Sequence, residues 1–349
     1  MHHAAASPQS DEHALRGTEP LTRLPFGVTS AFARLARSDD PRQDPIAAQY
    51  VPTEREHITL PYESNDPIGD ARYLVTERLV HRYKDRALLL VSDRCATYCR
   101  FCFRRHFTGL GGGRITDRQL DDACAYLAAA PAVREVLLSG GDPLMLSDRE
   151  LEAVIARLKK VDPRYVIRVC TRMPIFLPSR VTESLAHMLG GFNSIWAVIH
   201  ANHPRELTED SRAAIRTLLS AGVPVLDQTV LLRGINDDAD TLEELFRGLV
   251  MAGVKPYYLF QGDLAAGTAH FRVSIERGIE LMQELRFRMS GLALPTYAVD
   301  LPGGAGKVPI ETALLRIETN AYVLRGSDGG EHCYPRELEV PKAGAHSQA

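Results

Sequence analysis

The chain has 349 residues, of which 45% are hydrophobic and 24% charged, and its formal net charge is -3 at pH 7. This length is enough for one large domain with an added arm. The near-neutral charge argues against general nucleic-acid binding, and the absence of a run of about 18 apolar residues argues against a membrane span.

The first 85 residues differ from the rest of the chain. Residues 1–20 are small and polar, predict a disordered tail, and lack the apolar core of a secretory signal. Residues 21–85 are interrupted by prolines and predict an irregular or helical arm that wraps the core. The six cysteines are too sparse for a disulfide scaffold, so we expect a reducing, cytoplasmic location.

From residue 87 onwards, apolar runs alternate with helical patterns. The runs cover 87–91, 133–138, 165–170, 195–199, 223–232 and 257–260, and the helical patterns cover 117–130, 148–160, 182–189, 206–221, 241–252 and 274–289. Such alternation is typical of βαβ units and a parallel sheet, so the fold class is α/β. Six units predict an open, partial (β/α)6 barrel over residues 86–290, followed by a C-terminal segment over 291–349.

Three cysteines follow the first apolar run. Cys95, Cys99 and Cys102 have the spacing C-x3-C-x2-C. Three thiolates leave one iron of a 4Fe–4S cluster without a protein ligand. A structural zinc loop is the alternative, but zinc usually takes two pairs of ligands and no second C-x2-C pair follows. The spacing matches the radical S-adenosylmethionine (SAM) superfamily, in which SAM binds the fourth iron.

A glycine pair follows the second apolar run, in the segment Ser139-Gly140-Gly141-Asp142-Pro143. Glycines after a strand let the backbone approach a ligand closely. Alone, such a segment is more often a plain turn. Next to the cysteine loop it resembles the segment that contacts the SAM amino group in radical-SAM proteins.

A third signal is the glycine-rich stretch from Asp300 to Pro309, which contains Lys307. It is not a P-loop, because Val308 stands where Ser or Thr is needed. Lys307 could clamp a phosphate, lie in a solvated turn, or form a Schiff base if its pKa is lowered by burial.

Together these signals resemble the lysine 2,3-aminomutase family, radical-SAM enzymes that also use pyridoxal 5'-phosphate (PLP). The resemblance extends from about Leu21 to Val323. Beyond the three motifs, it rests on the segments Asp44-Pro45, Arg82-Tyr83-Lys84-Asp85-Arg86, His200-Ala201-Asn202-His203-Pro204, 228–237 and Pro256-Tyr257-Tyr258.

The resemblance implies roles for individual residues. Lys307 would be the catalytic lysine that binds PLP, and the C-terminal segment would carry it. The remaining implied PLP ligands are Arg82, Tyr83 and Arg86; the implied SAM ligands are Ser139, Gly140, Gly141, Asp142, His200 and Gln228. Without the resemblance, Arg82 and Arg86 would read as surface charge and His200 as a core histidine.

Three residues would bind the substrate. Arg104 corresponds to the family's arginine for the substrate carboxylate, and a planar guanidinium suits that task. Asp263 and Asp300 correspond to the pair that holds the distal ammonium of lysine. Two buried carboxylates need a cation between them, although Asp300 could simply start a turn and Asp263 cap a helix.

The expected activity is a 2,3-aminomutase that moves the α-amino group of a free basic amino acid, with L-lysine favoured, to the β-carbon. L-arginine, or a lysine on elongation factor P, are the alternatives. The larger members of the family have a C-terminal cysteine cluster for zinc, but Asp238 replaces an expected partner cysteine, so zinc is not expected here. The resemblance also implies an external electron donor of the flavodoxin or ferredoxin type. Homo-oligomerisation is left open.

Overall fold

The computed structural model describes residues 24–326 and 328–336. The expected disordered tail over 1–20 and the last residues of the C-terminal segment lie outside these ranges. Within them, no helix is both long enough and apolar enough to cross a membrane.

The core of the molecule is one ten-stranded sheet whose strands lie side by side in chain order. β3 to β9 pair in parallel, whereas the pairs β1–β2, β2–β3 and β9–β10 are antiparallel. The strands are β1 (Leu74–Thr76), β2 (Leu79–Tyr83), β3 (Arg86–Ser92), β4 (Glu135–Gly140), β5 (Val166–Thr171), β6 (Ile195–Ile199), β7 (Val225–Val230), β8 (Lys255–Phe260), β9 (Thr296–Leu301) and β10 (Gly306–Pro309). In the sheet described, β1 and β10 are unpaired edges, so the barrel is open.

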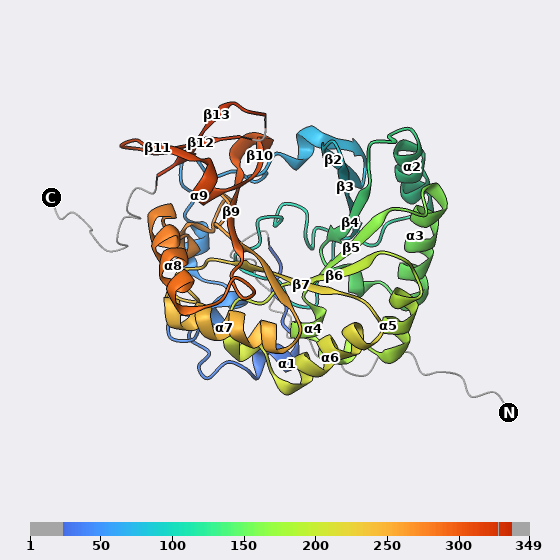
Figure 1. Ribbon diagram of the computed structural model, residues 1–349, viewed down its shortest axis with the longest axis horizontal. Helices are drawn as coiled ribbons and strands as arrows, with labels where there is room; N and C mark the ends of the chain where they lie inside the picture. Colours follow the sequence, from blue (N-terminus) through green and yellow to red (C-terminus); the bar gives the residue numbers. More distant parts are fainter. Residues whose placement is uncertain (1–23, 327, 337–349) are drawn as a thin grey trace.

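Six long helices follow β3 to β8 in turn and cover the outside of the curved sheet (Figure 1). They are α2 (Asp117–Ala128), α3 (Asp148–Val161), α5 (Glu183–Gly190), α6 (Glu209–Ser220), α7 (Ala239–Met251) and α8 (Ile275–Arg288). Thr116 and Ser147 form capping boxes at the starts of α2 and α3. The partial (β/α)6 barrel predicted from the sequence is thereby confirmed.

The N-terminal arm is irregular, and its helical parts are single turns. It contains α1 (Ser30–Ala33), η1 (Ala47–Gln49), η2 (Glu54–His57) and η3 (Asp70–Tyr73). Its last residues form β1 and β2, which extend the barrel sheet and which the sequence did not predict. Other single turns lie in the loops after the strands: η4 (Pro143–Met145), α4 (Met173–Phe176), η5 (Pro178–Arg180), η6 (Pro204–Glu206) and η7 (Ala269–Phe271).

The C-terminal segment contains more regular structure than the sequence predicted. β9 and β10 form a hairpin closed by the turn η8 (Pro302–Gly304). After α9 (Ile310–Ala313), a second sheet of β11 (Leu314–Ile317), β12 (Ala321–Arg325) and β13 (Glu331–Pro335) lies beside the hairpin and α8 (Figure 1). Tyr334 joins this sheet to the barrel, because its hydroxyl donates to the carbonyl of Gly262 at 2.9 Å.

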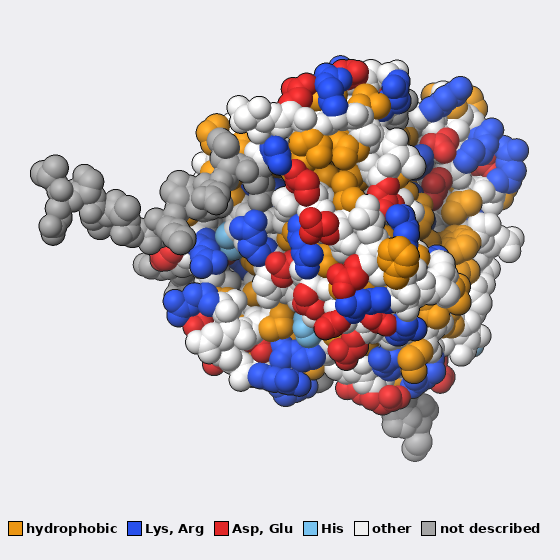
Figure 2. Space-filling model, turned by 60° about the vertical axis from the view of Figure 1, so that its left-hand side comes forward, with side chains coloured by type: hydrophobic (Ala, Val, Ile, Leu, Met, Phe, Trp, Pro, Cys, Tyr) orange, Lys and Arg blue, Asp and Glu red, His pale blue; other side chains and the backbone are white. Residues whose placement is uncertain are grey.

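The surface carries both signs of charge. On the face drawn in Figure 2, basic and acidic side chains are interspersed, which agrees with the small net charge of the chain.

Candidate active site

One cavity of about 480 Å³ inside the open barrel is lined by every residue for which the sequence suggested a role. Parallel α/β sheets collect their chemistry at the C-terminal ends of strands, and several of these residues lie there. The set is Arg82, Tyr83, Arg86, Cys95, Cys99, Cys102, Arg104, Ser139, Gly140, Gly141, Asp142, His200, Gln228, Asp263, Asp300 and Lys307.

The three cysteines lie in the loop after β3, and the N-terminal arm fixes this loop. The amide of Tyr98 donates to the carbonyl of Gly27 at 2.9 Å, and the amide of Arg100 donates to the carbonyl of Gln49 at 2.8 Å. Burial raises the pKa of all three thiols. Thiols with raised pKa values ionise when a bound cation stabilises the thiolates, as iron would.

In the described part of the chain, no group of three or more His, Cys, Asp or Glu side chains is close enough to hold a single metal ion. A 4Fe–4S cluster does not need such a group, because each thiolate binds a different iron. The thiols of Cys95, Cys99 and Cys102 nevertheless lie within one another's electrostatic reach, because each of Cys99 and Cys102 contributes to the raised pKa of Cys95. The donor set therefore fits a cluster.

The glycine pair at the end of β4 lets that strand pack against the base of the cysteine loop. A Cβ on Gly140 would lie 2.2 Å from the carbonyl oxygen of Ser92, and one on Gly141 would lie 2.2 Å from that of Arg94. The amides of Gly141 and Asp142 donate to the same two oxygens, each at 2.7 Å. The glycines therefore let β4 approach the cysteine loop closely, and the contact of this segment with SAM stays a prediction.

The carboxylate of Asp142 is buried and is used to hold the neighbouring strand end. It accepts hydrogen bonds from the hydroxyl of Thr171, at 2.7 and 2.9 Å, and from the amides of Leu144 and Arg172. Burial outweighs these bonds and raises the pKa of Asp142. Asp142 thus joins the ends of β4 and β5 in the cavity wall.

His200 follows β6 and its imidazole is neutral. Burial and the charge of Arg172 hold its pKa well below the usual range. Its Nε2 lies 2.9 Å from the side-chain oxygen of Asn202, and its ring lies 5.7 Å from that of Phe101 in the cysteine loop.

Two predicted arginines share a carboxylate that the sequence analysis did not identify. Asp70, in the arm, bonds Arg82 Nη2 at 2.8 Å and Arg104 Nη2 at 2.7 Å, and all three side chains are less than 10% exposed. Burial raises the pKa of Asp70, but the two guanidiniums outweigh burial and hold it below its usual value. No signal in the irregular arm could have identified Asp70.

Lys307 lies on β10, opposite Asp300 on β9. Its Nζ is 3.3 Å from an Asp300 oxygen and 3.9 Å from the centre of the Phe260 ring. Its amide donates to the hydroxyl of Tyr83 at 2.8 Å, which connects β10 to β2 across the opening of the sheet.

Asp263 follows β8 and faces the same space. Its pKa is raised to about 8 by burial and by the negative charge of Asp300, against the opposing fields of Lys307 and Arg104. Asp263 and Asp300 therefore interact as an acidic pair. Two cations lie near Asp300: Lys307 Nζ at 3.3 Å and Arg82 Nη1 at 4.0 Å.

Arg172 is a further cavity residue to which the sequence analysis gave no role. It follows β5, and its Nη1 donates to the sulfur of Cys99 at 3.0 Å. Its position directly after a parallel strand was the available signal, because such positions carry chemistry in this architecture.

Residues 89–246 match the Radical SAM superfamily. The chain is 41% identical over 307 residues to the L-lysine 2,3-aminomutase of Clostridium subterminale, covering 88% of this chain and 74% of that protein. It is 44% identical over 321 residues to the L-lysine 2,3-aminomutase of Fusobacterium nucleatum, covering 92% and 75%. The glutamate 2,3-aminomutase of Clostridioides difficile is 36% identical over 283 residues, covering 80% and 66%.

The superfamily match implies a 4Fe–4S cluster and SAM, which the three thiols in the cavity fit. The aminomutase relatives cover most of this chain and include both the barrel and the segment with Lys307. This chain therefore belongs to the L-lysine 2,3-aminomutase family and is an isomerase of the radical-SAM superfamily.

Proposed function

We propose that this protein is a PLP-dependent 2,3-aminomutase that moves the α-amino group of a free basic amino acid, with L-lysine favoured, to the β-carbon. The observation that carries the proposal is the acidic pair Asp263 and Asp300 beside Lys307, in the same cavity as the three cysteines. The proposal needs each of these groups, and neither a plain iron–sulfur protein nor a radical-SAM enzyme without PLP would use Lys307.

When bound, the cluster and SAM would supply the radical chemistry, and PLP would supply covalent chemistry at the amine. Cys95, Cys99 and Cys102 would hold the cluster. Ser139, Gly140, Gly141, Asp142, His200 and Gln228 would surround SAM, with backbone groups and a neutral imidazole as its polar neighbours.

The PLP phosphate would lie between Arg82 and Arg86. Both guanidiniums line the cavity, and Arg86 stacks on the ring of Tyr83 at 3.8 Å. Two arginines give the charge-assisted hydrogen bonds that a phosphate favours. Lys307 lies over the Phe260 and Tyr258 rings, so the wall beside its amine is aromatic.

Arg104 would orient the substrate carboxylate. Its Nε and Nη2 face Asp70, at 3.2 and 2.7 Å. This pairing fixes the plane of the guanidinium and leaves its remaining N–H groups to bind the substrate. Because the donor plane is fixed, a bound substrate carboxylate would hold the α- and β-carbons at a fixed position relative to the reacting groups.

The distal cation of the substrate would lie between Asp263 and Asp300. The Lys307 ammonium pairs with Asp300, and engagement of Lys307 by PLP would release this carboxylate for the substrate. A cation bound between the two carboxyls would then favour the ionised form of both. The glutamate handled by one relative would place a third carboxylate there, so we propose a basic substrate instead.

The test is an anaerobic assay with PLP, SAM and a chemical reductant or flavodoxin, on a panel of L-lysine, L-arginine, L-glutamate and intact elongation factor P. We expect β-lysine from L-lysine. Migration on arginine or elongation factor P alone would replace the proposed substrate, and migration on none of the four would reject the activity. Lys307→Ala should lose the visible absorbance of bound PLP but keep the iron absorbance of the cluster.

A further inference from the structure

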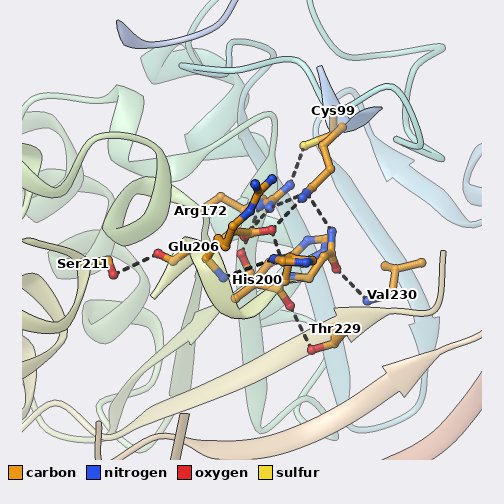
Figure 3. A network of polar contacts seen from close by, with 12 residues as sticks. Cys99, Arg172, His200, Glu206, Ser211, Thr229 and Val230 are labelled. Carbon is orange, nitrogen blue, oxygen red and sulfur yellow. Dashed lines mark hydrogen bonds and ion pairs between the residues drawn. The ribbon is translucent and has the colours of Figure 1, made fainter. Parts of the chain in front are cut away.

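A buried polar network lies directly behind the cysteine loop, and Arg172 is its centre (Figure 3). The guanidinium donates from Nη1 to Cys99 Sγ and from Nε to the carbonyl of His200, both at 3.0 Å. Its Nη2 donates to Gln49 Oε1 at 3.0 Å and to Glu206 Oε2 at 2.9 Å. One side chain thus connects a cluster ligand to the arm and to the loop after β6.

The partners of Arg172 are themselves held in place. Glu206 is fully buried, and its other oxygen accepts from Gln49 Nε2 at 2.7 Å and from the amide of Asn202 at 3.2 Å. Asn202 Nδ2 donates to Gln49 Oε1 at 3.2 Å. Because these groups bond one another, the guanidinium has little freedom to turn away from the sulfur.

The surroundings of Arg172 also exclude water. Its guanidinium carbon lies 4.2 Å from the centre of the Phe176 ring and 5.7 Å from that of Phe101. Solvent cannot easily replace a lost hydrogen bond in this position, and the field of a charge is screened less than at the surface.

The charges are arranged asymmetrically around the sulfur. The cation is bonded to Cys99, whereas the Glu206 carboxylate reaches the sulfur only through the guanidinium. The sulfur therefore experiences a net positive field, which Glu206 reduces. A reduced iron–sulfur cluster carries one more negative charge than the oxidised cluster, so this field favours reduction.

We propose that Arg172 is a positioning residue that raises the reduction potential of the cluster through its hydrogen bond to Cys99, and that Glu206 limits this effect. The proposal rests on the cluster at the three cysteines and adds two residues that set how readily it accepts an electron. It predicts that removal of the Arg172 charge lowers the reduction potential and that removal of the Glu206 charge raises it. A purely structural role would not produce shifts of opposite sign.

The experiment is a redox titration of the reconstituted full-length protein, followed by electron paramagnetic resonance of the reduced cluster. Arg172→Met combined with Glu206→Gln removes both charges, so neither is left buried alone. At a fixed potential we expect a reduced-to-oxidised ratio about tenfold lower than in the wild type, which corresponds to about 59 mV for a one-electron couple. Glu206→Gln alone should raise the reduced-to-oxidised ratio, because the charge of Arg172 is then uncompensated.

Arg205 and Asp44 provide the control. This pair also joins the arm to the loop after β6, at 2.7 Å, but no contact of Arg205 or Asp44 with a cysteine is found among the described residues. Arg205→Met with Asp44→Asn should leave the potential unchanged. An equal shift in this control, or shifts of the same sign in Glu206→Gln and the Arg172 double variant, would overturn the proposal.

Two further outcomes distinguish a failure of the proposed function from a failure of the proposal on Arg172. A wild-type protein that takes up no iron would refute the cluster, and with it the proposed function, independently of Arg172. If only the double variant loses its cluster, Glu206→Gln decides, and an unchanged or lowered potential in that variant contradicts the proposal.

Discussion

Among the individual residues of the cavity, Asp263 is the one whose protonation should depend most clearly on substrate binding. Its pKa of about 8, raised by burial and by Asp300, means that the free protein holds this carboxyl largely protonated at neutral pH. A cation bound between the two carboxyls would favour ionisation and lower this pKa. Binding of a basic amino acid must then release a proton below pH 8, and the release weakens binding as the pH falls.

The corresponding prediction is that the affinity of the PLP-loaded protein for L-lysine rises between pH 6 and pH 8, by up to roughly tenfold per pH unit. Asp263→Asn should bind more weakly and lose most of this dependence, whereas substitution of the exposed Asp240 by Asn should change neither. Calorimetry in two buffers of different ionisation enthalpy measures the proton release. An unchanged pH dependence in Asp263→Asn would show that another group is responsible.

Asp70 shows why part of the site was beyond sequence reasoning. Cysteine spacing, glycines and the resemblance identified residues with unusual patterns, but Asp70 lies in an irregular segment of ordinary composition. Its importance comes from long-range contacts with Arg82 and Arg104, which only the folded chain creates.

At the scale of the elements, the glycine pair Gly140 and Gly141 lets two neighbouring segments of the chain pack closely. The glycines were expected to let a ligand approach, and the close approach found is between β4 and the cysteine loop. The position of three cluster ligands therefore depends on the absence of two side chains on the next strand.

We predict that Gly141→Ala lowers iron uptake severalfold and destabilises the protein by at least about 1–3 kcal/mol, because its Cβ would lie 2.2 Å from a backbone oxygen. Gly291→Ala is the matched control, since nothing lies within 4 Å of its Cβ. We expect the control to stay within about 0.5 kcal/mol of the wild type. Iron content and urea unfolding measure both effects, and equal behaviour of the two variants would contradict the packing argument.

The elements that could be predicted are those with strong periodicity. All six barrel strands from β3 to β8 and their helices were anticipated, with boundaries within a few residues. The other four strands of this sheet, β1, β2, β9 and β10, were not, because these segments at the two ends of the sheet owe their conformation to pairing with the sheet rather than to a pattern of their own. Two of these strands, β9 and β10, form the hairpin that carries Lys307.

At the scale of the whole molecule, the arm forms part of the active-site wall. Residues Ile68 and Asp70 line the cavity, and Gln49 belongs to the network behind Cys99. The arm is also bonded to the barrel by Glu56, whose carboxylate is fully buried and receives Arg100 and Arg105, each at 2.6 Å. Docking of the arm and formation of the site should therefore be one event.

The last prediction tests this coupling with two neighbouring glutamates. Glu56→Gln removes the charge shared by two buried guanidiniums and should cost about 3–5 kcal/mol of unfolding free energy. Glu54→Gln, on the same turn but 83% exposed, should cost less than about 0.5 kcal/mol.

The stabilisation by Glu56 should depend on pH. Burial raises the pKa of Glu56, but the two arginines outweigh burial and lower this pKa. The stabilisation is therefore present above the unfolded pKa and is lost as the pH falls through the folded pKa. Urea unfolding at pH 7 and at pH 4 measures the difference. Coupling further requires that Glu56→Gln also lose iron and PLP together, and retention of both in a destabilised protein would show that the arm docks independently of the site.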